Sequence, residues 1–514
     1  MAFLSRIKKL ASETAIYGVS TIVGRLVNYL LVPIYLSFFD PELYGVVGFV
    51  YMSFLILNHV FQHGMESAYL KYASGTEGRE RVKQVFSTAT WSLLGVSLIL
   101  AGFIVLFRMP LSNLVSIGPD WSHLWYYAVI ILTVDALSIV PFAELRLQNR
   151  PFRFALIKVF NILVNVGLNL VLIVGFKEDI EAIFFSNLVA SVCTLLALIP
   201  VYVALFRGSF DVPLWKQLMA FGLPFIPSGL SYAFVDRVNL FFLGRMDGEQ
   251  IMTLYGDVIP STTLESVEEV GDVVLGQYVG GIFNGVWKLG VFMMLVVQMF
   301  RFAWQPFFLQ HAEDDDAPML FSRVFTVFTA GSLFVLLAIA FYVDVLVAIP
   351  TPFGSTLIPE QYWFALYLVP IAMVGYFFQG LYFNFTAGVY IEKKTSYFIV
   401  CAFAAAAVSL AINIFLIPVY GMLAAAWASA IAYAVMAVSL GIIVRRFYPV
   451  PYDWWAVGKT GVLALGLYLV WVYYDLSANW MAEGVLLLVY IIGLVVLRVL
   501  PWHVLGQLVR VRKG

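Results

Sequence analysis

The stretch of sequence that decides the fold is FGLPFIPSGLSYAFVDRVNLFFLG, residues 221–244. It is long and apolar enough to cross a bilayer as one helix. Asp236 and Arg237 nevertheless lie near its middle, where a charge is costly and persists only if it faces a partner or a water-filled cavity. Arg237 is therefore a predicted functional residue. Two glycines and two prolines in the first half of the stretch predict a bent helix that lines a polar cavity.

The composition of the whole chain agrees with a membrane protein. The chain has 514 residues, of which 62% are hydrophobic and 12% charged, and its mean hydropathy is +0.91. Soluble domains do not have such a composition, so we predict an all-α polytopic membrane protein. The net charge of −1 gives no electrostatic case for binding nucleic acid. Two cysteines are too few for a disulfide framework.

Apolar runs of about 20 residues predict fourteen transmembrane helices. The predicted spans are 13–36, 43–66, 86–107, 123–145, 154–176, 182–206, 217–244, 275–300, 324–349, 361–390, 396–417, 421–444, 455–475 and 479–500.

Basic residues orient these spans. Of the 30 lysines and arginines, all but six fall on the side that holds both termini. Arg108, Lys177 and Arg245 fall on the other side, and Arg25, Arg237 and Lys288 lie deep inside spans. Because cytoplasmic loops carry the excess of Lys and Arg, we predict a multi-pass membrane protein with both termini in the cytoplasm; the family resemblance described below implies that the membrane is the bacterial inner membrane.

The chain also repeats itself. Gly24-Arg25-Leu26-Val27-Asn28 is similar to Asp236-Arg237-Val238-Asn239, and the segment that begins at Asn169 is similar to the one that begins at Asn413. These repeats predict an N-lobe of six helices (1–212), a C-lobe of six helices (213–447) and a two-helix appendix (448–514). Six-helix repeats are parallel, and such pairs enclose a central cavity that alternates between the two sides of the membrane. We expect Arg25 and Arg237 to face each other across it.

Several stretches resemble one transporter family. They are FGLPFIPSGLSYAFVDRVNLFFLG, YVGGIFNGVWKLG (278–290), FQHGMESAYLKYAS (61–74) and SLAINIFLIPVYGMLAAAWASAIAY (409–433). Together they resemble the polysaccharide-exporter branch of the multidrug/oligosaccharidyl-lipid/polysaccharide (MOP) superfamily, which includes O-antigen-type flippases. The resemblance implies two lobes around a cavity and translocation of an undecaprenyl-diphosphate-linked oligosaccharide, for O-antigen, lipopolysaccharide or another surface polysaccharide, across the inner membrane.

A lipid diphosphate passing through hydrocarbon needs fixed cations and polar groups around it. Arginine suits this task because its planar guanidinium binds phosphate oxygens in pairs and stays ionised. We therefore predict that the substrate is bound by Arg25, Arg237, Lys288, Asn28, Asn239, Asn161, Asn165 and Asn169. Two alternatives remain: buried ion pairs for the arginines, and interhelical hydrogen bonds for the stripe at 161, 165 and 169.

Coupling to a proton or sodium gradient needs a carboxylate inside the membrane. Asp135, Asp236 and Asp344 are the candidates, and the sequence does not choose between proton, sodium and no coupling. No cofactor is predicted. No metal is predicted either, since the weak His59, His63 and Glu66 pattern lacks a further ligand.

Two other functions compete with the flippase. A multidrug or organic-cation antiporter of the same superfamily should present acidic rather than basic groups to its cavity. An enzyme, such as a membrane glycosyltransferase or polysaccharide polymerase, would need a sizeable outer catalytic domain. The acidic connection 246–274 is too short for that domain, and we predict that the protein is not an enzyme. Polysaccharide assembly proteins are possible partners.

Overall fold

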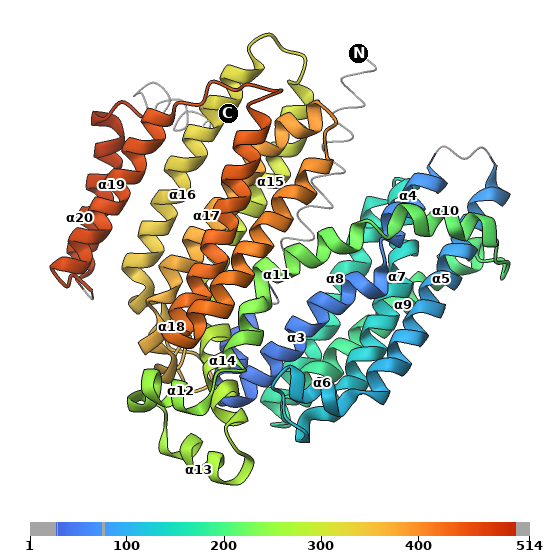
Figure 1. Cartoon of the computed structure of the whole chain (residues 1–514), viewed down its shortest axis with the longest axis horizontal. Coiled ribbons are helices and arrows are strands. Elements are labelled where there is room, and N and C mark those ends of the chain that lie inside the picture. Colours follow the sequence, from blue (N-terminus) through green and yellow to red (C-terminus); the bar gives the residue numbers. More distant parts are fainter. Residues whose placement is uncertain (1–26, 28, 75–77, 478, 500–514) are drawn as a thin grey trace. The chain divides into compact units, whose positions relative to one another are not determined.

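The computed structural model describes residues 27, 29–74, 78–477 and 479–499 (Figure 1). Within these residues the fold is helical and holds no strand, apart from an isolated bridge between Pro350 and Thr356. The main helices are α2 (Val32–Phe38), α3 (Pro41–Gln62), α4 (Met65–Ala73), α5 (Arg79–Leu106), α6 (Arg108–Leu114), α7 (Leu124–Leu147), α8 (Pro151–Asn169), α9 (Glu181–Leu205), α10 (Val212–Gly222), α11 (Phe225–Leu243), α12 (Gly248–Tyr255), α13 (Ser261–Val270), α14 (Val273–Trp287), α15 (Val291–Gln310), α16 (Ala317–Val347), α17 (Leu368–Ile391), α18 (Ser396–Val444), α19 (Trp454–Tyr473) and α20 (Trp480–Val496).

The described residues contain 11 helical segments that are long and apolar enough to cross a membrane. One of them, α18, covers two predicted spans, and its backbone leaves the helical region between them at Gly421 (φ 52°, ψ −128°). The shorter apolar helix α20 corresponds to the last predicted span. The first predicted span, 13–36, lies largely outside the described residues. The predicted all-α, multi-span fold is confirmed.

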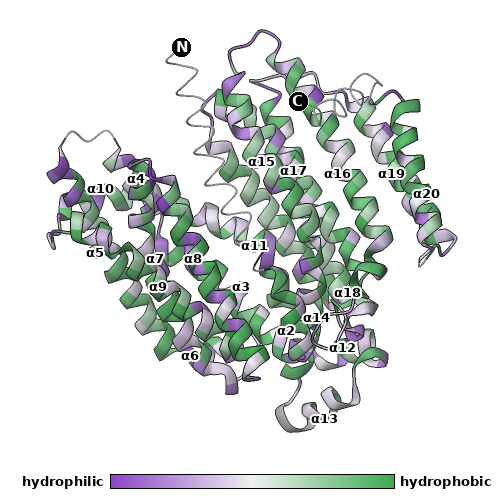
Figure 2. Ribbon diagram, turned by 180° about the vertical axis from the view of Figure 1, so that it is seen from behind, coloured by the Kyte–Doolittle hydropathy of each residue, from purple (hydrophilic) through white to green (hydrophobic). Residues whose placement is uncertain are grey.

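Hydrophobic residues dominate along the helices (Figure 2). Many of these side chains are exposed on the surface, for example Ile99 (74%), Val203 (79%) and Val462 (73%). In a bilayer these side chains face lipid, and helices satisfy their backbone hydrogen bonds internally. The exposed apolar surface is therefore what a membrane protein requires.

The chain forms two compact units. Unit 1 comprises residues 1–285 and 409–425, and unit 2 comprises residues 286–408 and 426–514. The predicted lobe boundaries at 212 and 447 follow the sequence repeat instead, and they stay a prediction.

Helix α7 lies at the centre of unit 1. It packs against α3, α5 and α9, while α8 packs on α9 and α11 packs on α3. Trp125, Leu132 and Val140 of α7 are all at most 2% exposed. The close packing of these apolar side chains holds α7 and its neighbouring helices in fixed positions. The polar groups of unit 1 are carried by these helices.

Unit 2 is organised around α16, which packs against α15, α17, α19 and α20. Its core includes Leu337, Phe341 and Tyr490. The Tyr490 hydroxyl donates a hydrogen bond to the Ala330 carbonyl at 2.9 Å. The two C-terminal helices are thus anchored to α16 by apolar packing and by one buried polar contact.

The predicted bend in the span 217–244 is a break between two helices: α10 ends at Gly222 and α11 begins at Phe225. Pro224 and Pro227 lack the N–H groups that a continuous helix needs. The end of α10 packs closely on the start of α4, since a Cβ atom on Gly64 would lie 2.0 Å from the Gly222 carbonyl oxygen.

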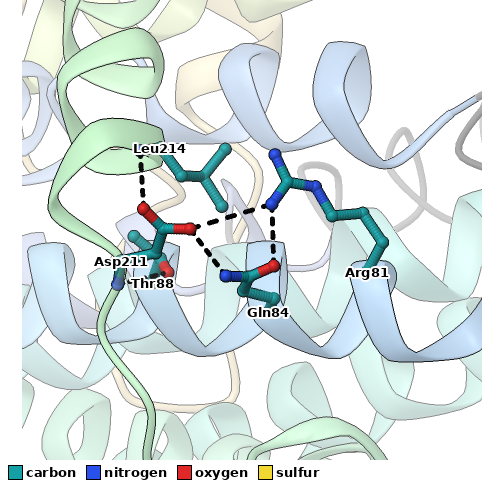
Figure 3. A network of polar contacts seen from close by, with 5 residues as sticks. All are labelled: Arg81, Gln84, Thr88, Asp211 and Leu214. Atoms are coloured by element: carbon teal, nitrogen blue, oxygen red, sulfur yellow. Dashed lines mark hydrogen bonds and ion pairs between the residues drawn. The ribbon is translucent and has the colours of Figure 1, made fainter.

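A polar network holds the start of α10 against α5 (Figure 3). Asp211 caps α10 by accepting a hydrogen bond from the Leu214 N–H at 3.0 Å. The other carboxylate oxygen accepts a hydrogen bond from Gln84 at 2.6 Å and lies 3.7 Å from Arg81. The Asp211 N–H donates to the Thr88 hydroxyl at 3.3 Å. The network fixes where the helix pair that carries Arg237 begins.

Candidate functional site

Arg237 lies in the second half of α11, inside a membrane span, and its side chain is only partly exposed (21%). Its Nε lies 3.2 Å from Oδ2 of the neighbouring Asp236, and its Nη1 donates to Oδ1 of Asn284 at 3.3 Å. The Tyr44 hydroxyl group of α3 is also near enough to interact with its charge. The arginine therefore sits in a polar cluster contributed by α3, α11 and α14, as an intramembrane charge requires.

Glycines bring α14 close enough to α3 to form this cluster. A Cβ on Gly45 would lie 2.0 Å from the Gln277 carbonyl oxygen, and a Cβ on Gly281 would lie 1.7 Å from the Pro41 carbonyl oxygen. Gly48 leaves room for the Asn284 amide, which a Cβ would approach to 2.9 Å. Small residues at helix contacts allow such close approach in membranes. The glycines of 278–281 thus have a packing role that sets the position of Asn284.

Asn284 was missed by the reasoning from single residues. It lies within YVGGIFNGVWKLG, is 3% exposed and forms the polar contact that reaches Arg237 from another helix. A signal was available, because an amide inside an apolar span next to close-packing glycines needs a hydrogen-bond partner. The partner itself could not be read from the sequence.

Asn239, two residues after Arg237, is 2% exposed. Its amide donates to the Ala425 carbonyl at 3.3 Å, and its Oδ1 accepts from the Leu240 N–H at 2.9 Å. The bond to Ala425 ties α11 to the part of α18 that belongs to unit 1. A binding role for Asn239 stays a prediction.

The asparagine stripe of α8 makes hydrogen bonds within unit 1. Asn161 donates to Thr194 of α9 at 2.9 Å. Asn169 accepts from the Tyr35 hydroxyl at 3.0 Å and donates to Asn165 Oδ1 at 2.7 Å. The bonds to Thr194 and Tyr35 join different helices, as in the alternative of interhelical hydrogen bonds, whereas the bond between Asn169 and Asn165 lies within α8. They favour a packing role for Asn169, which is fully buried.

The three ion-coupling candidates have different surroundings. Asp135 of α7 interacts with Ser191 of α9 and with Lys158 of α8, and Asp236 pairs with Arg237.

Asp344 lies in unit 2, where its charge interacts with Glu483 of α20. Lys288, also in unit 2, is half-buried in the turn between α14 and α15. Arg25 and Asn28 lie outside the described residues.

Solved structures with the same fold are membrane transporters. The chain resembles the lipid II flippase MurJ in an inward closed conformation, with a TM-score of 0.65 at 14% identity over 94% of this chain and 98% of that one. It also resembles an inward-facing multidrug resistance MATE family transporter, with a TM-score of 0.59 at 13% identity over 82% and 95% of the two chains. A third likeness is a MOP superfamily transporter from Pyrococcus furiosus, with a TM-score of 0.51 at 16% identity over 85% and 95%.

These likenesses define the class: the chain has the fold of the MOP superfamily of transporters. The model of the polysaccharide biosynthesis protein family matches residues 10–311, and the chain belongs to that family. Comparison with curated protein sequences gave no match. The predicted resemblance is thereby confirmed, and the solved structures that share the fold are described as transporters and a flippase.

Proposed function

We propose that the protein is a flippase that moves a polyprenyl-diphosphate-linked oligosaccharide across the bacterial inner membrane by alternating access. The cargo is an O-antigen unit or the repeat unit of another surface polysaccharide. Family membership and the MurJ-like fold support a role in polysaccharide export. The observation that carries the proposal is the intramembrane Arg237, held by Asn284 in a polar cluster.

The chemistry of Arg237 fits an anionic headgroup. A guanidinium keeps its charge in the membrane and offers several N–H donors to phosphate oxygens. Asp236 and Asn284 contact two of its nitrogens, and these contacts orient the group. In this proposal Arg25 and Lys288 supply further positive charge when the diphosphate occupies the cavity, and Asn28 and Asn239 contact the same ligand.

Movement of the sugar chain needs neutral polar groups, which bind sugar hydroxyls less strongly than charged groups do. Asn161 and Asn165 are half-buried on α8, and we assign them as the members of the stripe that contact sugar hydroxyls. Asp135 is the proposed ion-coupling carboxylate of unit 1, because it is an acid inside a membrane span with Lys158 and Ser191 of the neighbouring helices beside it.

Efflux of an organic cation is the second candidate, favoured by the likeness to MATE transporters and by Asp236 beside Arg237. The two functions differ in the sign of the charge that the site must hold. Arg237→Ala should abolish glycan export if the ligand is anionic, whereas it should improve cation transport if Asp236 is the binding group.

The test uses a strain whose surface glycan depends on this protein. Arg237→Ala should reduce glycan display by at least about tenfold, because a lost charged hydrogen bond is worth ~1.5–3 kcal/mol. Arg245→Ala is the matched control, since Arg245 lies outside the span, is exposed and contacts the Leu114 carbonyl. Normal display by Arg237→Ala at equal protein level would overturn the proposal.

A further inference from the structure

A second basic site lies in unit 1, on the side of the membrane that the charge count assigns to the cytoplasm. A cavity of about 490 Å³ is lined by Arg79 at the start of α5, by Arg150 and Arg153 at the start of α8, and by Gln148. The apolar end of α9 closes it from Pro200 to Leu205. Three arginines from two helices thus converge on one pocket.

These arginines have no carboxylate partner among the residues that the structure describes. Glu144, the acid of the pocket, is 6% exposed and accepts hydrogen bonds from Tyr69 and Gln148 at 2.6 Å each. Both carboxylate oxygens of Glu144 therefore already accept hydrogen bonds from other groups. Because three arginines line the pocket with one glutamate, the pocket has an excess of positive charge.

Neighbouring basic residues behave differently. Arg81 pairs with Asp211, Lys83 and Arg207 pair with Glu80, and Arg146 pairs with Glu66. Local acids thus neutralise the bases around the pocket but not the three that line it. An unneutralised arginine cluster in a concave site is suited to bind phosphate oxygens.

The surface next to the pocket is apolar and exposed. Phe152 and Leu156 of α8 are 75% and 70% exposed, and their spacing of four residues places them on one helix face. On α9, which packs against α8, Ile199 and Val203 are 44% and 79% exposed. A phosphate bound by the arginines would therefore have apolar surface beside it along both helices. A free phosphate makes no use of such a surface, whereas the acyl chains of a lipid do.

We propose that Arg79, Arg150 and Arg153 bind the phosphate of an anionic membrane phospholipid in the cytoplasmic leaflet, with its acyl chains along α8 and α9. Basic pockets between membrane helices on the cytoplasmic side bind anionic headgroups in this way. The site is separate from Arg237 and does not depend on the proposed function.

The experiment measures binding of phosphatidylglycerol to the purified full-length protein in detergent, with phosphatidylethanolamine and inorganic phosphate as separate arms. The wild type should bind phosphatidylglycerol in preference to both. The triple variant Arg79→Gln, Arg150→Gln, Arg153→Gln should bind it at least about tenfold more weakly, since all three basic groups that attract the anionic headgroup are lost. A second triple variant with lysine at these positions should keep most of the affinity.

The matched control removes the same charge elsewhere. Lys393, Lys394 and Arg446 are exposed bases of unit 2, and replacing all three with glutamine should leave binding unchanged. Single variants, Arg150→Gln and Arg153→Gln, serve if the triple variant does not fold, and each should weaken binding about threefold or more.

Four results would overturn the proposal. Three are equal binding of phosphatidylethanolamine, an equal loss in the unit 2 control, and unchanged binding by the pocket variants. The fourth is inorganic phosphate that binds as tightly as phosphatidylglycerol, because the site would then recognise a soluble anion.

Discussion

Arg237 of α11 and Asn284 of α14 are joined by a hydrogen bond of 3.3 Å across 47 residues of sequence. The bond links a charged group, which membranes tolerate only with a partner, to an amide that glycine packing brings within reach. The relationship predicts that these two residues act as one unit in transport.

Asn284→Ala should therefore reduce glycan export by about tenfold, because the Arg237 guanidinium loses a hydrogen bond worth ~1.5 kcal/mol. In an Arg237→Ala background the same substitution should have little further effect. Export by the two single variants and the double variant, at matched protein level, measures the coupling. Additive losses would show that Asn284 acts without Arg237.

Gly45 and Gly281 set the separation of α3 and α14. Gly281→Ala places a Cβ 1.7 Å from the Pro41 carbonyl oxygen, and such overpacking should destabilise the fold by ~1–3 kcal/mol. Gly95→Ala is the control on α5, where the added Cβ meets nothing within 4 Å and helix propensity improves. Thermal unfolding in detergent compares the two variants. A Gly281→Ala midpoint equal to that of the wild type would contradict the close packing.

The helix break in α18 is held by Tyr255 at the end of α12. Its hydroxyl accepts a hydrogen bond from the Met422 N–H at 2.7 Å, next to Gly421 with its positive φ. Tyr255→Phe leaves that amide without its acceptor and should cost ~1–3 kcal/mol of stability. Tyr420→Phe, at an exposed hydroxyl one residue before the break, should cost nothing measurable. Equal unfolding midpoints for the two variants would refute the role of Tyr255.

Asn161 and Thr194 test the two interpretations of the asparagine stripe. If their 2.9 Å hydrogen bond only packs α8 on α9, Asn161→Ala and Thr194→Ala should lower stability by similar amounts, ~0.5–1.5 kcal/mol, and should not add. If Asn161 binds sugar, export should fall further in Asn161→Ala than in Thr194→Ala. We expect the second pattern, and unfolding measurements together with export assays separate it from the first.

Much of the fold could be predicted from the sequence, because apolar runs, charge asymmetry and the Pro224 and Pro227 break are local signals with strong physical causes. Arg237 could be singled out for the same reason. The partner Asn284 could not, since it depends on how Gly45 and Gly281 bring two distant helices together. The position of the α18 break could be predicted, as the gap between the spans 396–417 and 421–444, but its backbone geometry at Gly421 and the contact with Tyr255 could not.

The basic pocket shows a further limit of sequence reasoning. Counting Arg79, Arg150 and Arg153 as cytoplasmic charge predicts orientation, but it does not show that these three share a cavity while Arg81 and Arg146 are ion-paired. Which arginine forms an ion pair depends on the tertiary structure, so arginines that are close in the sequence can have different roles.

The most direct test of the central claim is transport by the purified protein in vesicles. A polyprenyl-diphosphate-linked oligosaccharide is placed in one leaflet, and its appearance in the other leaflet is followed with a glycan-modifying enzyme confined to that side. The account predicts transfer by the wild type and by Arg245→Ala, and a loss of at least about tenfold in Arg237→Ala. Equal transfer by the wild type and Arg237→Ala, or none by the wild type while an organic cation is transported, would contradict it.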